Sequence, residues 1–181
     1  MPEAHDARVG RLRDAYRESH ARFVQRLHSV PEDVAARAPS AGGWSVAQIG
    51  WHVAAVDGLF ASLVSGERPV PPLPDTFVER PWADILASLP ERIESASAVV
   101  PPGEVAFAGV MEGLERSAEE LDAALAALTP ERGARCGVTH PVFGTVNLYQ
   151  IGDWAIAHTI RHNAQAKRVL NSLSPSPSAG V

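Results

Sequence analysis

The apolar residues of this chain recur every three or four positions over most of its length, and this period constrains the fold most strongly. From Asp6 to Val30 the recurring residues are Val9, Leu12, Tyr16, Phe23, Leu27 and Val30. Because an α-helix turns once in 3.6 residues, residues at these spacings share one face, whereas a half-buried strand alternates every second residue. No sustained alternation of that kind occurs in the sequence. We therefore expect an all-α protein.

A second helix is predicted from its capping residues. Ser45 and Gln48 stand three residues apart, which is the S-x-x-Q form of a capping box, and the pattern ends near Gly66. The face that should turn inward carries Ile49, His52, Val56, Leu59 and Leu63. One polar residue, His52, therefore falls within an apolar stripe.

Two more helices are predicted in the second half of the chain. One follows Gly103, has an inner face of Val110, Leu114, Ala118, Leu121, Leu125 and Leu128, and ends at Thr129-Pro130. Asn147 can cap the other, which runs to about Leu170. Its inner face comprises Leu148, Ile151, Ala155, His158, His162, Gln165 and Val169.

The connections between these helices are marked by proline and glycine. The stretch from Pro31 to Gly43 has room for one short turn, prolines interrupt the stretch from Arg68 to Pro81, and Trp82 to Val99 could hold a helix broken around Pro90. We expect a four-helix bundle, residues 1–171, with a long proline-rich connection between its second and third helices. Residues 172–181, which are rich in serine and proline, are expected to be disordered.

Composition limits the classes of function. The chain has 181 residues, which suits one domain, and its 16 basic against 21 acidic residues give a net charge of −5. This charge argues against binding to nucleic acid through a basic face. The single cysteine, Cys136, cannot form an internal disulfide, and neither a signal-peptide pattern nor about 18 consecutive apolar residues occur. We expect a cytoplasmic protein without membrane contact.

Histidines suggest where chemistry takes place. His158 and His162 are four residues apart on a predicted helix, so their imidazoles rise from the same face and can reach one ion. Both lie on the inner stripe, where two imidazoles are costly to bury unless each has a partner, and a metal ion would be one. His52 on the facing helix could complete a set of three, which is the open arrangement of a catalytic zinc site.

Less specific interpretations remain open for these histidines. A pair of histidines at this spacing also occurs on solvated helix faces, and His52 could be a core histidine hydrogen-bonded to a nearby oxygen. A metal-free helical bundle that acts through dimerisation is a further alternative.

The same residues carry a resemblance to a known family. The segment from Gly43 to Gln48, with His52 eight residues after Trp44, resembles the first motif of the DinB/YfiT-like family of metal-dependent enzymes. The second motif is similar in order and spacing: His140-Pro141-x-x-Gly144, a helix start near Asn147, and His158-x-x-Arg161-His162-x-x-Gln165. The motifs cover about residues 42–57 and 140–169, and the helices extend the likeness over about residues 5–171.

The resemblance implies a four-helix bundle that binds a divalent ion through His52, His158 and His162, with positions left open for water or substrate. Family members with known activity transfer low-molecular-weight thiols, or isomerise or hydrolyse small molecules, and members often form homodimers. We accordingly expect zinc or nickel, a small-molecule substrate, and activation of a small thiol or water for transfer or hydrolysis. The alternative is a non-catalytic metal-binding or stress-response module of the same fold.

Other polar residues near these motifs have two interpretations each. Gln48 could orient His52, although capping its own helix is the simpler role. Gln165 could orient His162 or make an ordinary interhelical hydrogen bond. Asp57 and Asp153 could each accept a histidine N–H, or be solvated.

The remaining candidates need no catalytic role. His140 could approach the mouth of the pocket or simply belong to a turn, and Cys136 matters only if it lies near the three histidines. Trp44, Trp51, Trp82 and Trp154 are expected to pack in the core or at its rim. His5, His20 and His28 lack a partner motif and are interpreted as ordinary.

Overall fold

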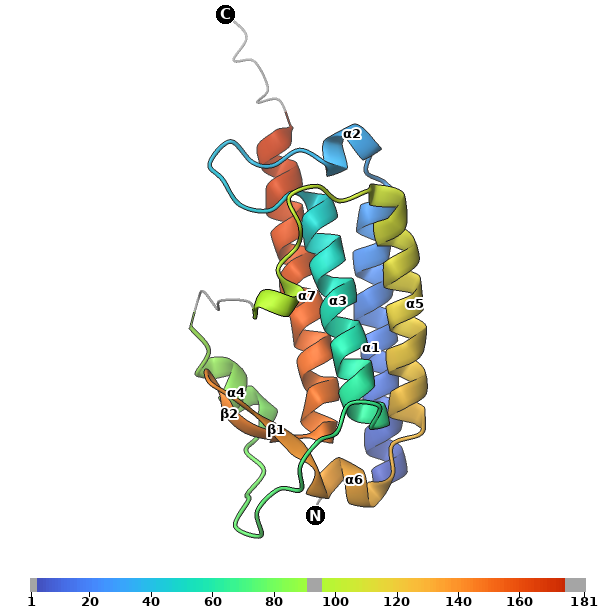
Figure 1. Ribbon diagram of the computed structural model, residues 1–181, viewed down its shortest axis with the longest axis vertical. Coiled ribbons are helices and arrows are strands. Elements are labelled where there is room, and N and C mark those ends of the chain that lie inside the picture. Colours follow the sequence, from blue (N-terminus) through green and yellow to red (C-terminus); the bar gives the residue numbers. More distant parts are fainter. Residues whose placement is uncertain (1–2, 91–95, 175–181) are drawn as a thin grey trace, which may run out of the picture.

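Four long helices dominate the structure, a computed structural model that describes residues 3–90 and 96–174 (Figure 1). They are α1 (His5–His28), α3 (Val46–Ser65), α5 (Phe107–Ala126) and α7 (Leu148–Leu173). Shorter helices lie on the connections: α2 (Glu32–Ala35), α4 (Trp82–Ala87), the 3-10 helix η1 (Ser97–Val99) and α6 (Pro130–Arg135). The predicted helical class is confirmed.

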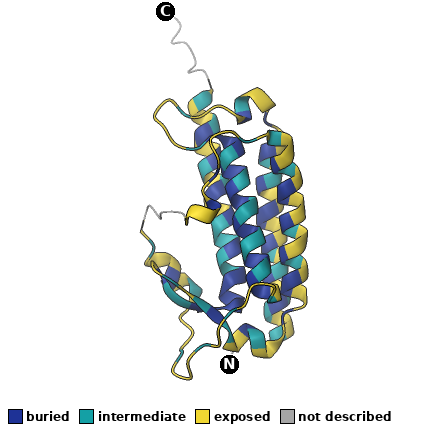
Figure 2. Cartoon of the chain, in the orientation of Figure 1, coloured by how far each residue is buried: buried dark blue, intermediate teal, exposed yellow. Residues whose placement is uncertain are grey.

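The long helices lie side by side and turn their buried faces towards one another (Figure 2). Helix α3 packs against α5 and α7, and α1 packs against the same two helices. Buried residues continue from end to end of this interior, including Leu12, Phe23, Ile49, Leu121 and Ile151. Each of them lies on a stripe that the 3.6-residue period predicts.

The ends of α3 and α7 are set by capping residues. The Ser45 hydroxyl accepts the N–H of Gln48, and the Gln48 side chain accepts the N–H of Ser45. Helix α3 ends at Ser65 and is capped by Gly66, whose φ of 89° is a left-handed conformation that favours glycine. Asn147 and Gln150 form the same reciprocal cap on α7. The predicted beginnings of both helices are therefore correct.

A small hairpin that we did not predict precedes α7. Strands β1 (Gly137–His140) and β2 (Gly144–Asn147) pair antiparallel, with Gly137 opposite Asn147 and His140 opposite Gly144. The sequence analysis treated this stretch as loop, because four-residue strands are too short for a period of two to stand out. Helix α6 was also missed: Thr129, interpreted as the end of a helix, accepts the N–H of Arg132 and caps a new one.

The predictions for the connections and for the C-terminal end agree with the structure in part. The stretch from Arg68 to Pro81 forms a loop with one bridge, between Pro72 and Cys136, and α4 and η1 occupy the two ends of the stretch Trp82 to Val99. Residues 91–95, next to the expected break at Pro90, lie outside the described part. Helix α7 ends at Leu173, beyond the predicted helix end near Leu170, so residues 172 and 173, which were expected in the disordered tail, are helical. Tail residues 175–181 also lie outside the described part.

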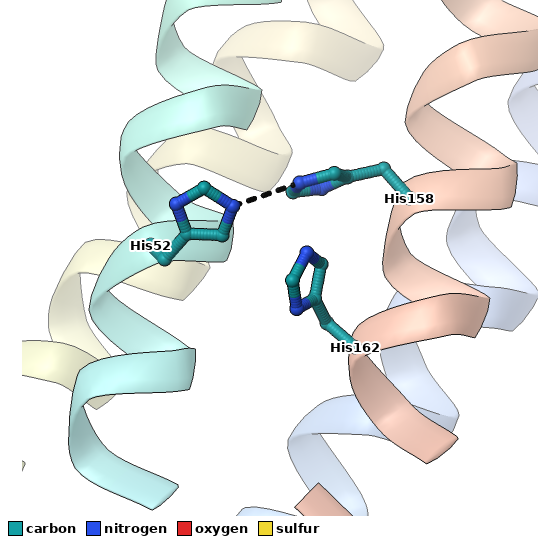
Figure 3. Close-up of side chains that lie close together, drawn as sticks. All are labelled: His52, His158 and His162. Atoms are coloured by element: carbon teal, nitrogen blue, oxygen red, sulfur yellow. Dashed lines mark hydrogen bonds between the residues drawn. The ribbon is translucent and has the colours of Figure 1, made fainter. Parts of the chain in front are cut away.

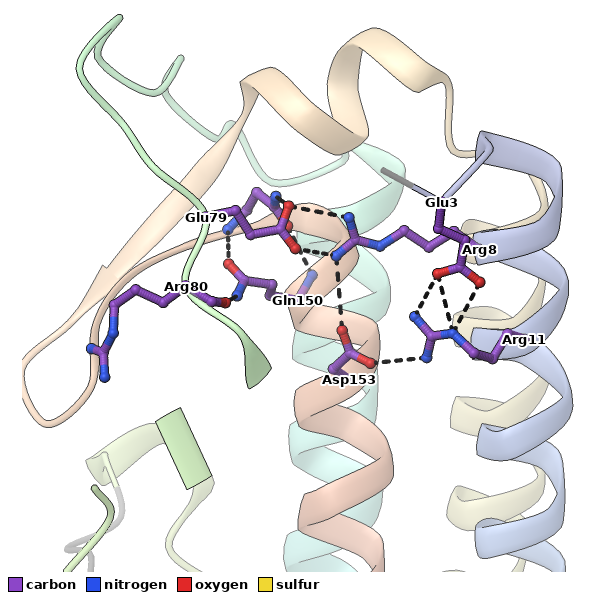
Figure 4. Close-up of polar contacts among 8 residues, drawn as sticks. Glu3, Arg8, Arg11, Glu79, Arg80, Gln150 and Asp153 are labelled. Carbon is purple, nitrogen blue, oxygen red and sulfur yellow. Dashed lines mark hydrogen bonds and ion pairs between the residues drawn. The ribbon is translucent and has the colours of Figure 1, made fainter. Parts of the chain in front are cut away.

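A polar network fastens the proline-rich loop to α1 and α7 (Figure 4). Arg8 of α1 donates to Glu79 of the loop, and Glu79 also accepts from Asn147 at 2.8 Å. Arg8 lies 3.9 Å from Asp153 of α7, and Arg11 bridges Asp153 and Glu3. The loop therefore leads into α4 at a defined place beside α7.

Helix α3 is the one helix of the described chain that is long and apolar enough to cross a membrane. More than half of its apolar stretch is buried against the other helices. Burial of this extent is what the central helix of a globular protein shows, so the feature is weak evidence for a membrane span.

Candidate metal centre

Three histidines meet between α3 and α7 (Figure 3). His52 comes from α3, and His158 and His162 come from successive turns of α7. One ring nitrogen from each lies within 4.8 Å of the corresponding atoms of the other two. The structure thus brings together all three of the residues that the sequence analysis selected.

Hydrogen bonds set the orientation of two of these rings. The Nδ1–H of His52 donates to the backbone carbonyl of Val99 at 2.6 Å. The Nδ1–H of His162 donates to the side-chain oxygen of Gln165 at 2.7 Å. Since both acceptors are oxygens without a hydrogen, Nδ1 carries the proton in each neutral ring, and Nε2 keeps its lone pair. Two lone pairs are thereby directed into the space between the helices.

The third ring, that of His158, completes the group. Its Nε2 lies 3.1 Å from Nε2 of His52, and its ring centroid is 4.3 Å from that of His162. Its Nδ1 is buried and has no hydrogen-bond partner within the described residues. The protein therefore leaves this imidazole less satisfied than the other two.

The electrostatics of the centre keep all three imidazoles neutral. Burial lowers the pKa of His52, and the Val99 carbonyl opposes that effect. Burial lowers the pKa of His162 to about 3 and that of His158 well below its ordinary value, with smaller contributions from the neighbouring histidines and Arg161. Neutral imidazole is the form that binds metal ions, so protons do not compete for these nitrogens near neutral pH.

The donor set fits a divalent ion. Two nitrogens that bind one tetrahedral zinc ion lie about 3.3 Å apart, since each Zn–N bond is about 2.0–2.1 Å long. The 3.1 Å between the Nε2 atoms of His52 and His158 is close to that value. Three imidazoles without a carboxylate or thiolate suit zinc, nickel, iron and copper better than magnesium or calcium. This group could therefore hold a metal ion.

Comparison with known proteins agrees with this geometry. The sequence profile of the DinB superfamily matches residues 15–166, which include α3, α5, the greater part of α1 and α7, and the three histidines. The chain belongs to the DinB superfamily. A comparison of this DinB-superfamily protein with curated proteins finds no match.

The two glutamines have different roles in this DinB-superfamily protein. Gln48 caps α3 and donates to the carbonyls of Pro102 and Gly103, so the capping interpretation is correct. Gln165 accepts from His162, which is the orienting role that the sequence analysis left open. A metal-binding histidine is commonly fixed by such a partner on its second nitrogen.

Neither of the two candidate acids contacts a histidine of the centre. Asp57 is fully buried on α3, where it accepts a hydrogen bond of 2.9 Å from the Tyr16 hydroxyl. Asp153 is paired with Arg11 at 3.2 Å in the polar network. Neither acid holds a histidine, because each has a partner on α1. Asp57 is not solvated either, since it is fully buried, whereas Asp153 keeps partial contact with solvent.

The other candidates lie around the centre. Trp44 packs against His52 with ring centroids 4.9 Å apart, which places it at the rim. His140 is in the hairpin, and Cys136 directly follows α6, outside the group of three histidines. The sequence analysis missed Val99, whose carbonyl orients His52. A backbone carbonyl leaves no signal in the sequence, because every residue has one.

Proposed function

We propose that this chain is a metal-dependent enzyme of the DinB type. In this proposal the four long helices form a DinB-type four-helix bundle, and His52, His158 and His162 hold a divalent ion, zinc or nickel. The reaction is transfer of a small thiol to a small molecule, or hydrolysis of that molecule by water. The observation that carries the proposal is the convergence of three neutral imidazoles from two helices.

The donor set determines what an ion at this place can do. Three neutral ligands leave a divalent ion with its full charge, and such an ion acts as a Lewis acid that lowers the pKa of a thiol or water. The absence of a fourth ligand among the described residues near the three histidines agrees with an open centre rather than a closed structural one.

The residues of the chain supply position and shielding. The Val99 carbonyl and the Gln165 amide hold His52 and His162 in one tautomer and one orientation. Trp44 covers one side of His52, and Phe60 lies edge-on to His158 at 6.4 Å. These two aromatic rings line the centre beside His52 and His158.

Elemental analysis tests the proposal. Untagged protein purified without chelator is expected to contain about one equivalent of a divalent ion, and His162→Ala is expected to contain little. His28→Ala, which removes an exposed histidine of α1, serves as the matched control and should keep the ion. Equal metal content in all three proteins would show that the histidines are core residues.

Turnover separates an enzyme from a binding module. The loaded protein is incubated with low-molecular-weight thiols and electrophilic acceptors, and loss of free thiol is followed with and without chelator. Consumption that stops with chelator, and that His162→Ala lacks, supports an enzyme. A full equivalent of metal without turnover of any pair would favour the non-catalytic metal-binding module.

A further inference from the structure

The three histidines of the centre are not equally buried. His52 and His162 are 3% and 8% exposed, whereas His158 is only partly buried. Of the three side chains, His158 is therefore the one most open to a small molecule from solvent. What lies next to His158 determines which molecules can bind.

A run of aromatic rings continues from His158 towards the hairpin. Trp154 lies four residues before His158 on α7, so it occupies the same face one turn away, about 6 Å along the axis. Phe60 of α3 contacts both, with ring centroids 4.8 Å from Trp154 and 6.4 Å from His158. Trp154 is partly exposed, so an apolar surface extends from the centre along α7.

His140 stands at the far end of this surface. Its ring stacks on Phe143 at 4.2 Å, with only 14° between the planes, and lies edge-on to Trp154 at 5.1 Å. Phe143 in turn lies edge-on to Trp154 at 4.3 Å. The hairpin thus holds the His140 ring edge-on beside Trp154, which is itself partly exposed.

The hydrogen bonding of His140 leaves one donor available. The backbone N–H of Val142 donates to Nδ1 of His140 at 3.2 Å, so Nδ1 carries the lone pair. In the neutral ring the proton is then on Nε2, which makes no hydrogen bond within the described part of the chain. An oriented N–H donor next to an apolar surface can recognise an acceptor oxygen on a ligand.

We propose that His140 is a substrate-binding residue that donates from Nε2 to a carboxylate or carbonyl oxygen of a substrate whose planar, apolar body lies on Trp154. This inference rests on the proposed function, because the reacting end of that substrate lies at the three histidines. It assigns the substrate class: an elongated small molecule with a flat apolar middle and an acceptor oxygen at the end remote from the reacting group. The hairpin then determines specificity rather than chemistry.

Two thiols that differ in one group test the assignment. Zinc-loaded protein is titrated calorimetrically with 4-(mercaptomethyl)benzoate and with benzyl mercaptan, which lacks the carboxylate. The carboxylate is expected to tighten binding about tenfold in the parent protein, which is typical of a hydrogen bond to a charged group. Equal dissociation constants for the two thiols, or binding of neither to protein that carries zinc, would overturn the assignment.

Two variants of His140 separate the hydrogen bond from the stacking. His140→Phe keeps a ring against Phe143 and removes the donor, so the tenfold preference should disappear. His140→Gln keeps an N–H near the position of Nε2 and should retain part of the preference. A preference that persists in His140→Phe would contradict the proposal.

Zinc content is measured for each variant, together with helicity by circular dichroism, to confirm that the fold and the centre persist. If the parent protein holds no zinc, the proposed function itself fails. If it holds zinc and binds both thiols equally, only the role of His140 fails. The two failures are therefore distinguishable.

Discussion

Asp57 lies in the interior of the four long helices with one oxygen hydrogen-bonded to Tyr16 and the other without a partner among the described residues. Burial raises the pKa of this carboxyl to about 8, although the hydrogen bond from Tyr16 opposes the rise. At neutral pH the folded protein therefore keeps a proton on Asp57 that the unfolded chain, with an ordinary pKa near 3.8, has released. Folding at neutral pH therefore requires Asp57 to take up a proton, and this uptake becomes less favourable as the pH rises.

We expect this residue to make the protein less stable as the pH rises. Between pH 7 and 8 the folded state binds more protons at Asp57 than the unfolded state, so the free energy of unfolding falls, by about 1 kcal/mol. In Asp57→Asn that contribution is absent. Urea denaturation at pH 7 and pH 8 measures the difference between parent and variant.

The pH range and the control isolate the effect of Asp57. Burial lowers the pKa of His20 to about 4, so His20 contributes with the opposite sign and only below about pH 6.5. Asp14→Asn, which removes an exposed acid of α1, should keep the pH dependence of the parent. Identical pH dependence in Asp57→Asn and in the parent would refute the assignment.

Single residues differ in how far the sequence could predict them. The spacing of His158 and His162, with His52 on a facing stripe, made the three histidines candidates, and the family resemblance implied them as a ligand set. Gln165 lies three residues after His162, within reach on the same helix face, and was selected as well. Asp57 was misjudged because its partner, Tyr16, is 41 residues away, and no local pattern connects the two.

Gly50 allows α3 to approach α1 and α5 closely. A Cβ atom added to Gly50 would lie 2.6 Å from Val110 of α5 and 2.9 Å from Leu27 of α1. Both of these side chains are buried, and the valine is stiff at its branched Cβ. The separation of α3 from α1 and α5 thus depends on the absence of a side chain at position 50.

We expect Gly50→Ala to destabilise the protein despite the higher helix propensity of alanine. Overpacking of a core by one methyl group costs about 1–3 kcal/mol, which lowers Tm by roughly 2–10 °C in a chain of this size. Gly58→Ala is the matched control on the same helix, where an added Cβ meets nothing within 4 Å. It should raise stability by about 0.5–1 kcal/mol. Calorimetric melting compares the two, and a Tm of Gly50→Ala at or above that of the parent would contradict this packing argument.

Elements were predictable where they are long or carry reciprocal caps. Ser45 with Gln48 indicates the beginning of α3, and Gly66 its end, in the printed sequence itself. The β1–β2 hairpin was missed because its pairing, from His140 with Gly144 to Gly137 with Asn147, is decided by contacts between residues four to ten positions apart rather than by a local period. The hairpin is also stabilised by the contact of Phe143 with Trp154 of α7, and this tertiary contact leaves no pattern in the local sequence.

At the scale of the whole molecule, the proposed ion connects two helices that already pack on each other. Any ligand that binds the folded state alone raises the free energy of unfolding, by about 2.7 kcal/mol when its concentration is 100 times Kd. We expect zinc at that concentration to raise the Tm of metal-free protein by roughly 5–10 °C. Differential scanning calorimetry with and without zinc measures the shift.

The same measurement on His162→Ala serves as the control and should give no shift. Chelator added to the zinc-loaded parent should restore the lower Tm. If the Tm of the parent protein changes with neither zinc nor chelator, the three histidines do not form a metal site in solution.

The three histidines come from two places in the chain, and this separation has a kinetic consequence. His158 and His162 are one turn apart on α7, so their two nitrogens are in place as soon as that helix has formed. His52 lies 106 residues before His158 and arrives only when α3 has docked. If the centre holds an ion as proposed, an ion that needs all three nitrogens is acquired last. The metal in the centre is then set by the metal pool that the finished protein meets rather than by the one present during its synthesis.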